Sequence, residues 1–192
     1  MPGYSKHRPL LKFYLMEVIL TLLVVMIARP QMGTKISKDK REGIEAMIAL
    51  DISNSMLAED VAPSRLERSK RLVEDLLNHF TNDKIGLVVF AGDAFVQLPI
   101  TADYISAKMF LDNISPSLIG SQGTDIAKAI ELSQHSFTQN SKFGKAIIII
   151  TDGENHEGGA EEMARKAQKA GIRVFILGIT LNGSYYTGTG NL

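Results

Sequence analysis

The sequence predicts an α/β fold: a doubly wound, mostly parallel sheet with helices on both faces, preceded by one transmembrane helix. Three observations predict this fold. Hydrophobic runs of strand length alternate with amphipathic helical segments, and several of these runs are apolar throughout, as strands buried on both faces must be. In addition, a chain of 192 residues is too short for a closed barrel of β/α repeats, which leaves an open sheet.

The composition narrows the classes of function. Hydrophobic residues make up 45% of the chain and charged residues 22%, which is typical of a globular protein. Because cysteine is absent, disulfides, thiolate metal sites and a cysteine nucleophile are excluded. No basic run or aromatic-plus-basic pattern indicates nucleic-acid binding. The net charge is zero, but residues 1–42 are basic and the rest of the chain is acidic.

Residues 10–28 are predicted to form the transmembrane helix, after a basic segment at 1–9 and before a linker at 29–42. At helical rise this segment would span about 28 Å, close to the thickness of a bilayer core. Two other interpretations stay open. The apolar residues 18–28 have the length of a signal-peptide core, and Glu17 favours a buried amphipathic helix. Basic residues flank the segment on both sides, so charge counting leaves its orientation ambiguous.

The domain itself is predicted at residues 43–181, and its elements alternate in type. Strand-like runs occupy residues 44–52, 85–91, 94–98, 146–150 and 172–179. Helical spacing starts at Pro63-Ser64 and recurs at residues 104–114, 124–137 and 160–170.

Three details of these elements are also expected. Met109, Phe110 and Ile114 are predicted to face the core, and Thr124 is predicted to cap the helix that follows it. Residues 182–192 are rich in Gly, Ser, Thr and Tyr and are predicted to form a flexible tail.

Polar residues gather where the predicted strands end. DISNS (51–55) follows the first strand, TDG (151–153) follows the apolar run AIIII, and GTD (123–125) opens a helix at the same rim. Each sequence alone is an ordinary turn or cap, but open sheets bind ligands at this edge. The three segments offer carboxylate and hydroxyl oxygens, a donor set that suits Mg²⁺ or Mn²⁺ rather than zinc. An open coordination position on such an ion can accept a carboxylate from another molecule.

These three motifs resemble the metal-ion-dependent adhesion site of the von Willebrand factor type A domain, which has a Rossmann-like fold. The resemblance implies five metal ligands, the last of them binding directly or through water: Asp51, Ser53, Ser55, Thr124 and Asp152. Five neighbouring residues are expected to form the rim that meets a partner: Asn54, Glu59, Gln122, Gly123 and Gly153.

Longer stretches resemble the Bat proteins, membrane-anchored type A domain proteins named for Bacteroides aerotolerance. These stretches are ARPQ (28–31), MLAEDVAPSRLERSKR (56–71) and FAGDAFVQLPIT (90–101). The resemblance implies a protein of the bacterial inner membrane with its domain in the periplasm, and other Bat proteins and a MoxR-type AAA+ ATPase as partners. The family continues past the strand at 172–179 with a helix and an edge strand, so we expect a C-terminally truncated domain with an exposed sheet edge.

The resemblance implies metal-dependent protein–protein interaction in the cell envelope, linked to stress or oxygen tolerance, with no catalysis. One alternative is a Mg²⁺-dependent phosphohydrolase of the haloacid dehalogenase type, with Asp51 as nucleophile, Lys145 as charge stabiliser and Asp152 as metal ligand. That chemistry needs a second aspartate two residues after the nucleophile, where this chain has Ser53. The other alternative is a structural adaptor that needs no metal. No Gly-x-Ser-x-Gly elbow or phosphate-binding glycine loop supports other enzyme classes.

Overall fold

The structure is a computed structural model, and its chain divides into two units, Met1–Arg41 and Glu42–Leu192. The residues that it describes are 7–27, 43–139, 142–153, 159–179 and 186–189. The predicted linker at 29–42 and most of the predicted basic segment at 1–9 lie outside these residues.

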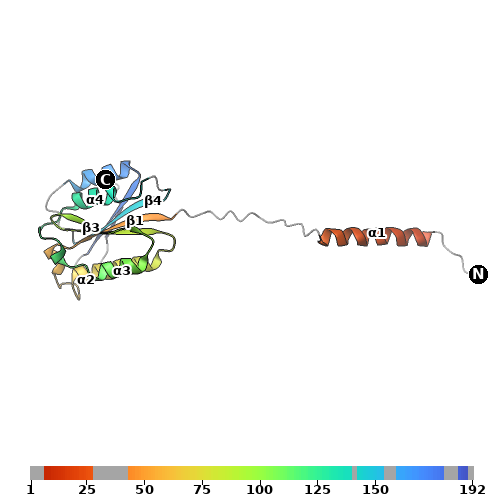
Figure 1. Ribbon diagram of the computed structural model, residues 1–192, viewed down its shortest axis with the longest axis horizontal. Helices are drawn as coiled ribbons and strands as arrows, with labels where there is room; N and C mark the ends of the chain where they lie inside the picture. Colours follow the sequence, from red (N-terminus) through yellow and green to blue (C-terminus); the bar gives the residue numbers. More distant parts are fainter. Residues whose placement is uncertain (1–6, 28–42, 140–141, 154–158, 180–185, 190–192) are drawn as a thin grey trace, which may run out of the picture. The chain divides into compact units, whose positions relative to one another are not determined.

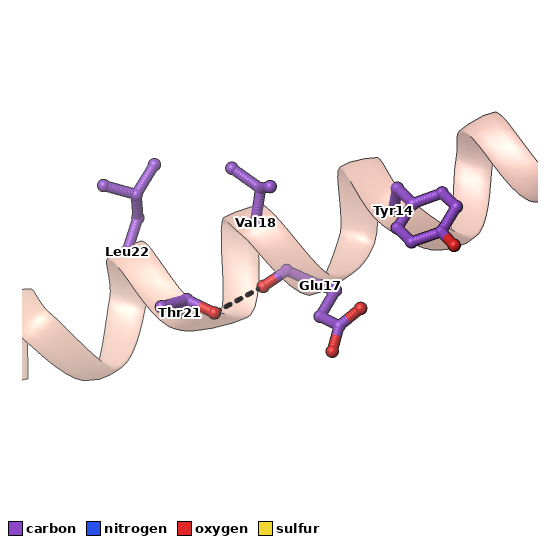
Figure 2. Close-up of a pocket in the computed structure, with 5 residues that line it drawn as sticks. All are labelled: Tyr14, Glu17, Val18, Thr21 and Leu22. Carbon is purple, nitrogen blue, oxygen red and sulfur yellow. Dashed lines mark hydrogen bonds between the residues drawn. The ribbon is translucent and has the colours of Figure 1, made fainter.

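The first unit contains one helix, α1 (His7–Ile27). Figure 2 shows part of this helix, where the Thr21 hydroxyl donates to the backbone carbonyl of Glu17 at 2.8 Å. Val18 and Leu22 point to one side of the helix, and the Glu17 carboxylate points to the other (Figure 2). The apolar side chains described along α1, from Leu10 to Met26, are exposed within this unit.

The sequence predicted that residues 10–28 cross a membrane. The structure confirms a helix there, but none of the helices in the described ranges has the length and apolar character that crossing a membrane requires. The charged side chains of Lys12 and Glu17 interrupt the apolar run. The membrane-spanning part of the prediction is therefore not supported.

The second unit is built on one six-stranded sheet, with the order β3-β2-β1-β4-β5-β6. The strands are β1 (Ile44–Asp51), β2 (Lys84–Phe90), β3 (Ala94–Thr101), β4 (Gly144–Thr151), β5 (Ile172–Gly178) and β6 (Tyr186–Thr189). The four central strands are parallel, and β3 and β6 pair antiparallel at the two edges. The prediction of a doubly wound, mostly parallel sheet is confirmed.

Helices cover both faces of this sheet (Figure 1). They are α2 (Arg65–His79), α3 (Tyr104–Asp112), α4 (Ile126–His135) and α5 (Ala160–Lys169), with two short 3₁₀ helices, η1 (Asn54–Leu57) and η2 (Pro116–Leu118). Alternation along β1 sends Ile48 and Leu50 into a core with α2 and α3, and Met47 and Ala49 into a core with α4 and α5. A strand buried on both faces must be apolar throughout, which explains the unbroken runs in the sequence.

The expectation about which side chains of α3 face the core was wrong in part. Met109 and Phe110 are 62% and 41% exposed, because α3 packs against the sheet through Ala107 and Leu111. Those two residues lie four apart on one face of the helix, and only Ile114 of the predicted trio is buried.

Of the predicted tail at 182–192, the described residues are 186–189, and the rest lies outside the described ranges. Residues Tyr186–Thr189 form β6, which pairs antiparallel with Phe175–Gly178 of β5. This pairing gives the β5 backbone a hydrogen-bonded neighbour, so the described edge strand on this side of the sheet is β6.

Candidate metal centre

The first loop of the candidate site begins at the last residue of the central strand β1. Asp51 is fully buried there, and its Oδ1 accepts a hydrogen bond from the backbone N–H of Ser53 at 2.9 Å. The N–H of Ile52 donates to the carbonyl of Phe90 at 2.9 Å, which ties the loop to the end of β2. The hydroxyl oxygens of Ser53 and Ser55 lie 3.0 Å apart. The loop therefore gathers three of the predicted ligands into one small volume.

The helix η1 holds this loop in place. The N–H of Met56 donates to the carbonyl of Ser53 at 3.0 Å, and the N–H of Ala58 donates to the carbonyl of Ser55 at 3.1 Å. The Met56 side chain is fully buried in the core, whereas Asn54 is exposed. The buried Met56 side chain thus anchors the loop to the core, while Asn54 faces solvent.

The donor geometry fits a small divalent cation. Adjacent oxygens around Mg²⁺, each bonded at about 2.1 Å in an octahedron, lie about 3.0 Å apart. The Ser53 and Ser55 hydroxyls form a hydrogen bond with 3.0 Å between their oxygens, and this separation equals such an edge. Within the ranges that the structure describes, no three His, Cys, Asp or Glu side chains lie close enough together to hold a metal ion by themselves. A cation here would therefore depend on hydroxyl oxygens to complete a shell that carries two carboxylates.

The third loop, which carries the predicted TDG motif (151–153), meets the first through Thr151, a residue of that motif that the sequence analysis did not name as a ligand. Its hydroxyl donates to Asp51 Oδ2 at 2.7 Å and accepts from the N–H of Gly153 at 3.2 Å. The contact follows from the parallel register, in which Leu50 pairs with Ile150, so the next residues of β1 and β4 are neighbours. This register is what could have identified Thr151 as a partner of Asp51, but it can be derived only when the strand order is known.

Burial raises the pKa of Asp51 above its ordinary value, because the charged form loses hydration. Hydrogen bonds from Ser53 and Thr151 act in the opposite direction and favour the carboxylate. A nearby divalent cation would also favour the ionised form. The environment of Asp51 is therefore one in which a cation can supply the missing stabilisation of a buried negative charge.

The second loop, which carries the predicted GTD motif (123–125), is held beside the end of β2 by a backbone hydrogen bond. The N–H of Asp125 donates to the carbonyl of Ala91, just after β2, at 2.8 Å. The Asp125 side chain accepts from the N–H of Lys128 at 3.0 Å, so Asp125 caps α4. The prediction that Thr124 caps this helix is wrong by one residue. Thr124 is 1% exposed and lies outside the helix, so its hydroxyl is not used as the cap.

Close packing fixes the position of the second loop. A Cβ built on Gly92 would lie 2.4 Å from the carbonyl oxygen of Gln122, so only glycine permits this approach. Gly123 has a φ of 124°, a backbone conformation that favours glycine. The loop that carries Thr124 therefore rests directly on the end of β2.

The third-loop carboxylate, Asp152, is held by an arginine that the sequence analysis also did not assign. The Arg65 guanidinium donates from Nη1 to Asp152 Oδ2 at 2.9 Å, and from Nη2 to Asp60 Oδ2 at 2.7 Å. The Asp152 side chain is fully buried. The hydrogen bonds from Arg65 lower the pKa of Asp60 below its ordinary value.

The predicted rim residues are accessible in part. Asn54, Glu59, Gln122 and Gly153 are exposed, and Gly123 is half-buried. Backbone bonds join the first and second loops at β2, and the Asp51–Thr151 bond joins the first and third. Asp51 thus ends β1, Ser53 and Ser55 follow it, and Asp152 follows β4. Thr124 lies on the loop before α4, which is hydrogen-bonded to residues just after β2.

The phosphohydrolase alternative required Lys145 beside Asp51. The structure places Lys145 at the other end of β4, where it pairs in register with Glu45. Its Nζ lies 5.6 Å from the centre of the Phe137 ring. Lys145 therefore does not lie at the carboxyl edge that carries Asp51.

Comparison with known proteins finds a matching domain family and two similar Bacteroides proteins of known structure. A family model described as von Willebrand factor type A domain matches residues 46–154. The crystal structure of BatB, a conserved hypothetical protein from Bacteroides thetaiotaomicron, is 54% identical, with a TM-score of 0.69, and covers 78% of this chain and 82% of that one. An aerotolerance-related membrane protein from Bacteroides fragilis is 53% identical, with a TM-score of 0.69 and coverage of 78% and 83%.

More distant proteins share the fold or part of the chain. An uncharacterized protein of Borreliella burgdorferi is 30% identical over 161 residues, which is 82% of this chain and 47% of that protein. The chain thus spans about half the length of such relatives. The proximal thread matrix protein 1 of the mussel byssus, in a structure with a zinc-occupied MIDAS motif, is 20% identical, with a TM-score of 0.63 and coverage of 72% and 36%. At that identity the likeness shows the fold alone.

Proposed function

The chain belongs to the von Willebrand factor type A domain family and is similar to Bat-type aerotolerance-related membrane proteins, and on that premise we propose that it binds partner proteins through a divalent cation. The observation that carries the proposal is the arrangement of oxygens in the first loop. Buried Asp51 lies beside the Ser53 and Ser55 hydroxyls, which are hydrogen-bonded to each other at 3.0 Å, a spacing that two ligands of an octahedral ion also have.

The proposed ligands are the two carboxylates, Asp51 and Asp152, and the three hydroxyls of Ser53, Ser55 and Thr124. Mg²⁺ or Mn²⁺ bound there supplies a Lewis-acidic position that a carboxylate of the partner fills. The chain's own residues orient the donors: Thr151 and the Ser53 N–H fix the Asp51 carboxylate, and η1 fixes the serines. Exposed Asn54 and the rest of the rim then contact the partner around that carboxylate.

We propose a binding role without catalysis. A phosphohydrolase of the haloacid dehalogenase type needs an acid–base aspartate where this chain has Ser53, and a lysine beside the nucleophile. Lys145 lies at the other end of β4, over the Phe137 ring. A metal-independent adaptor is the remaining alternative, and chelation of the metal separates it from the proposal.

We also propose that the protein works at a bacterial membrane, with its type A domain in the periplasm. The similarity to Bat-type membrane proteins supports this location, together with the exposed apolar side chains of α1. Other Bat proteins and a MoxR-type AAA+ ATPase are the proposed partners in a complex linked to oxygen or stress tolerance. Cell fractionation tests the location: the chain is expected in the membrane fraction, and a chain lacking residues 1–41 is expected to leave it.

Calorimetric titration of Mg²⁺ and Mn²⁺ into the full chain tests the metal site. We expect saturable binding by the wild type, no binding by Asp51→Ala, and affinity at least tenfold weaker in Asp152→Ala. Asp75→Ala removes an exposed carboxylate from α2 and is expected to bind like the wild type. A folded wild type that binds neither ion, or an Asp51→Ala protein that binds normally, would overturn the metal site and leave the adaptor.

A further inference from the structure

Arg65 is the first residue of α2, and the local structure brings its side chain to the candidate metal centre. Ser64 caps α2 by accepting from the N–H of Glu67 at 3.2 Å, which fixes where the helix starts. The N–H of Arg65 also donates to the carbonyl of Ala58 at 3.1 Å, directly after η1. The start of α2 is therefore joined by a backbone hydrogen bond to the end of the first loop's short helix.

The guanidinium group connects two carboxylates. Its Nε donates to the Asp60 oxygens at 3.0 and 3.2 Å, and its Nη2 donates to Asp60 Oδ2 at 2.7 Å. Its Nη1 donates to Asp152 Oδ2 at 2.9 Å. The side chains of Arg65 and Asp60 are 18% and 19% exposed, and that of Asp152 is fully buried. A planar guanidinium with several N–H donors suits this bridging geometry, which a lysine cannot reproduce in full.

We propose that Arg65 is a positioning residue that sets how strongly the centre holds its cation, acting through Asp152, with Asp60 as the group that holds Arg65. The inference rests on the proposed metal site and adds a control of its affinity. Arg65 and a divalent cation both interact with the Asp152 carboxylate, which is one of the two acidic ligands. Because Arg65 holds one Asp152 oxygen, it competes with direct ligation of the cation by that oxygen.

The charges of Arg65 and Asp60 predict whether each substitution strengthens or weakens cation binding. A guanidinium close to the centre repels a divalent cation and neutralises part of the negative charge that attracts it. Removing the guanidinium therefore strengthens cation binding. Removing the Asp60 charge has the opposite effect, because the positive charge of Arg65 then loses its other partner and acts on Asp152 alone. A merely structural role for this trio would weaken binding in both variants.

The test is calorimetric titration of Mg²⁺ into four full-length proteins: wild type, Arg65→Gln, Asp60→Asn and Arg173→Gln. Arg173 is an exposed arginine near the start of β5, at the other end of the sheet, so its variant makes the same change of charge away from the centre. We expect binding at least threefold tighter in Arg65→Gln and at least threefold weaker in Asp60→Asn. Arg173→Gln is expected to stay within twofold of the wild type, because solvent screens exposed charges at that distance.

Thermal unfolding supplies a second readout and guards against misfolding. Without metal, Arg65→Gln leaves the buried Asp152 without its arginine, so its melting temperature falls, and saturating Mg²⁺ raises it by more than in the wild type. Arg65→Lys keeps the positive charge and is expected to bind Mg²⁺ within twofold of the wild type. Shifts of equal sign in Arg65→Gln and Asp60→Asn, or no shift in either, would overturn the inference while leaving the metal site intact. Absence of binding in the wild type would overturn both.

Discussion

At the scale of single residues, the candidate centre depends on how one buried carboxylate is hydrogen-bonded. Asp51 accepts from the Thr151 hydroxyl at 2.7 Å and from the Ser53 N–H at 2.9 Å, one bond on each oxygen. These two bonds fix the plane of the carboxylate before any cation binds. A preorganised ligand loses less conformational freedom on binding, so in the proposed metal site Thr151 is expected to raise metal affinity without touching the metal.

Thr151→Val is expected to weaken both the fold and the metal site. The change keeps the shape of the side chain but leaves Asp51 Oδ2 without its donor, at a cost of about 1–3 kcal/mol in the free energy of unfolding. We also expect Mg²⁺ affinity to fall at least threefold. Thr151→Ser retains the hydroxyl and serves as the matched control. Denaturant unfolding and Mg²⁺ titration measure the two effects, and equal behaviour of the valine and serine variants would contradict this role.

A second buried carboxylate lies at the opposite end of the same strand. Glu45 is fully buried, with its Oε2 accepting from the N–H of Thr138 at 3.2 Å and its Oε1 at 3.6 Å from Lys84 Nζ. Its Oε1 is one of two buried side-chain oxygens in the described part of the chain that lack a hydrogen bond. The ion pair with Lys84 is therefore the main compensation for the charge of that oxygen.

Lys84→Met is expected to destabilise the domain by about 2–4 kcal/mol, because it leaves the Glu45 charge buried without its cation. The double variant with Glu45→Gln removes that charge as well and is expected to lose clearly less stability than Lys84→Met alone. Urea unfolding followed by circular dichroism measures both. A double variant at least as unstable as the single one would show that the ion pair does not matter in this way.

Residue types indicated the proposed ligands of the candidate centre, but they could not reveal the residues that hold those side chains in place. Asp51, Ser53 and Asp152 stood out because oxygen-rich residues followed predicted strands. Arg65 gave no such signal, since an arginine at a helix start is common and its role appears only when the fold brings it to a residue far along the chain. Thr151 required the strand order, because its partner lies on a strand that is distant in sequence.

At the scale of elements, the second loop shows how the end of a strand and the start of a helix position a site together. Asp125 caps α4 and its backbone N–H reaches the carbonyl of Ala91 at 2.8 Å. The loop before it packs so closely on Gly92 that a Cβ there would meet the Gln122 carbonyl at 2.4 Å. The position of Thr124 is therefore set by a capping residue on one side and by a glycine contact on the other.

Gly92→Ala is expected to push the second loop away from β2. The added methyl group must displace backbone atoms, so we expect a loss of about 1–3 kcal/mol in the free energy of unfolding and weaker Mg²⁺ binding. Gly120→Ala is the control, because a Cβ on Gly120 meets nothing within 4 Å and its φ is not positive. Thermal unfolding and Mg²⁺ titration are the measurements, and a Gly92→Ala protein that matches Gly120→Ala in both would contradict the close-packing argument.

The period of hydrophobicity predicted the existence and order of most elements, but not their exact ends or all their faces. The sequence predicted Thr124 as the helix cap, whereas the structure has Asp125. Both residue types can cap a helix, and only the hydrogen bond from the Lys128 N–H to Asp125 decides between them. On α3, small Ala107 lets the helix approach the sheet, which turns the larger Met109 outward. Packing, rather than hydrophobicity alone, decided which side faced the core.

At the scale of the whole type A unit, the strand order brings three distant loops to one edge of the sheet (Figure 1). The parallel pairing of β1 with both β2 and β4 places the carboxyl ends of these strands side by side. The sequence could predict this arrangement, because unbroken apolar runs that alternate with helices indicate a parallel sheet. It could not predict β6, whose Gly- and Thr-containing residues carry no strand periodicity and are ordered through pairing with β5.

Removal of residues 186–192 is expected to expose the edge of β5 and to promote association between copies. The lost partner leaves the β5 backbone groups unpaired along an apolar strand, which other chains can then bind. We expect a lower midpoint of urea unfolding and larger particles in light scattering than for the full chain. Mg²⁺ affinity is expected to stay within twofold, because β6 does not carry a proposed ligand. Unchanged stability and particle size would show that β6 does not protect this edge.

The measurement that tests the central claim most directly is anomalous diffraction from crystals of the full chain soaked in Mn²⁺. The account predicts one strong manganese peak about 2.1 Å from the hydroxyl oxygens of both Ser53 and Ser55, next to Asp51, and no peak there in Asp51→Ala crystals. A wild-type crystal at saturating Mn²⁺ with no peak at these serines, or with its only peak elsewhere, would contradict the claim.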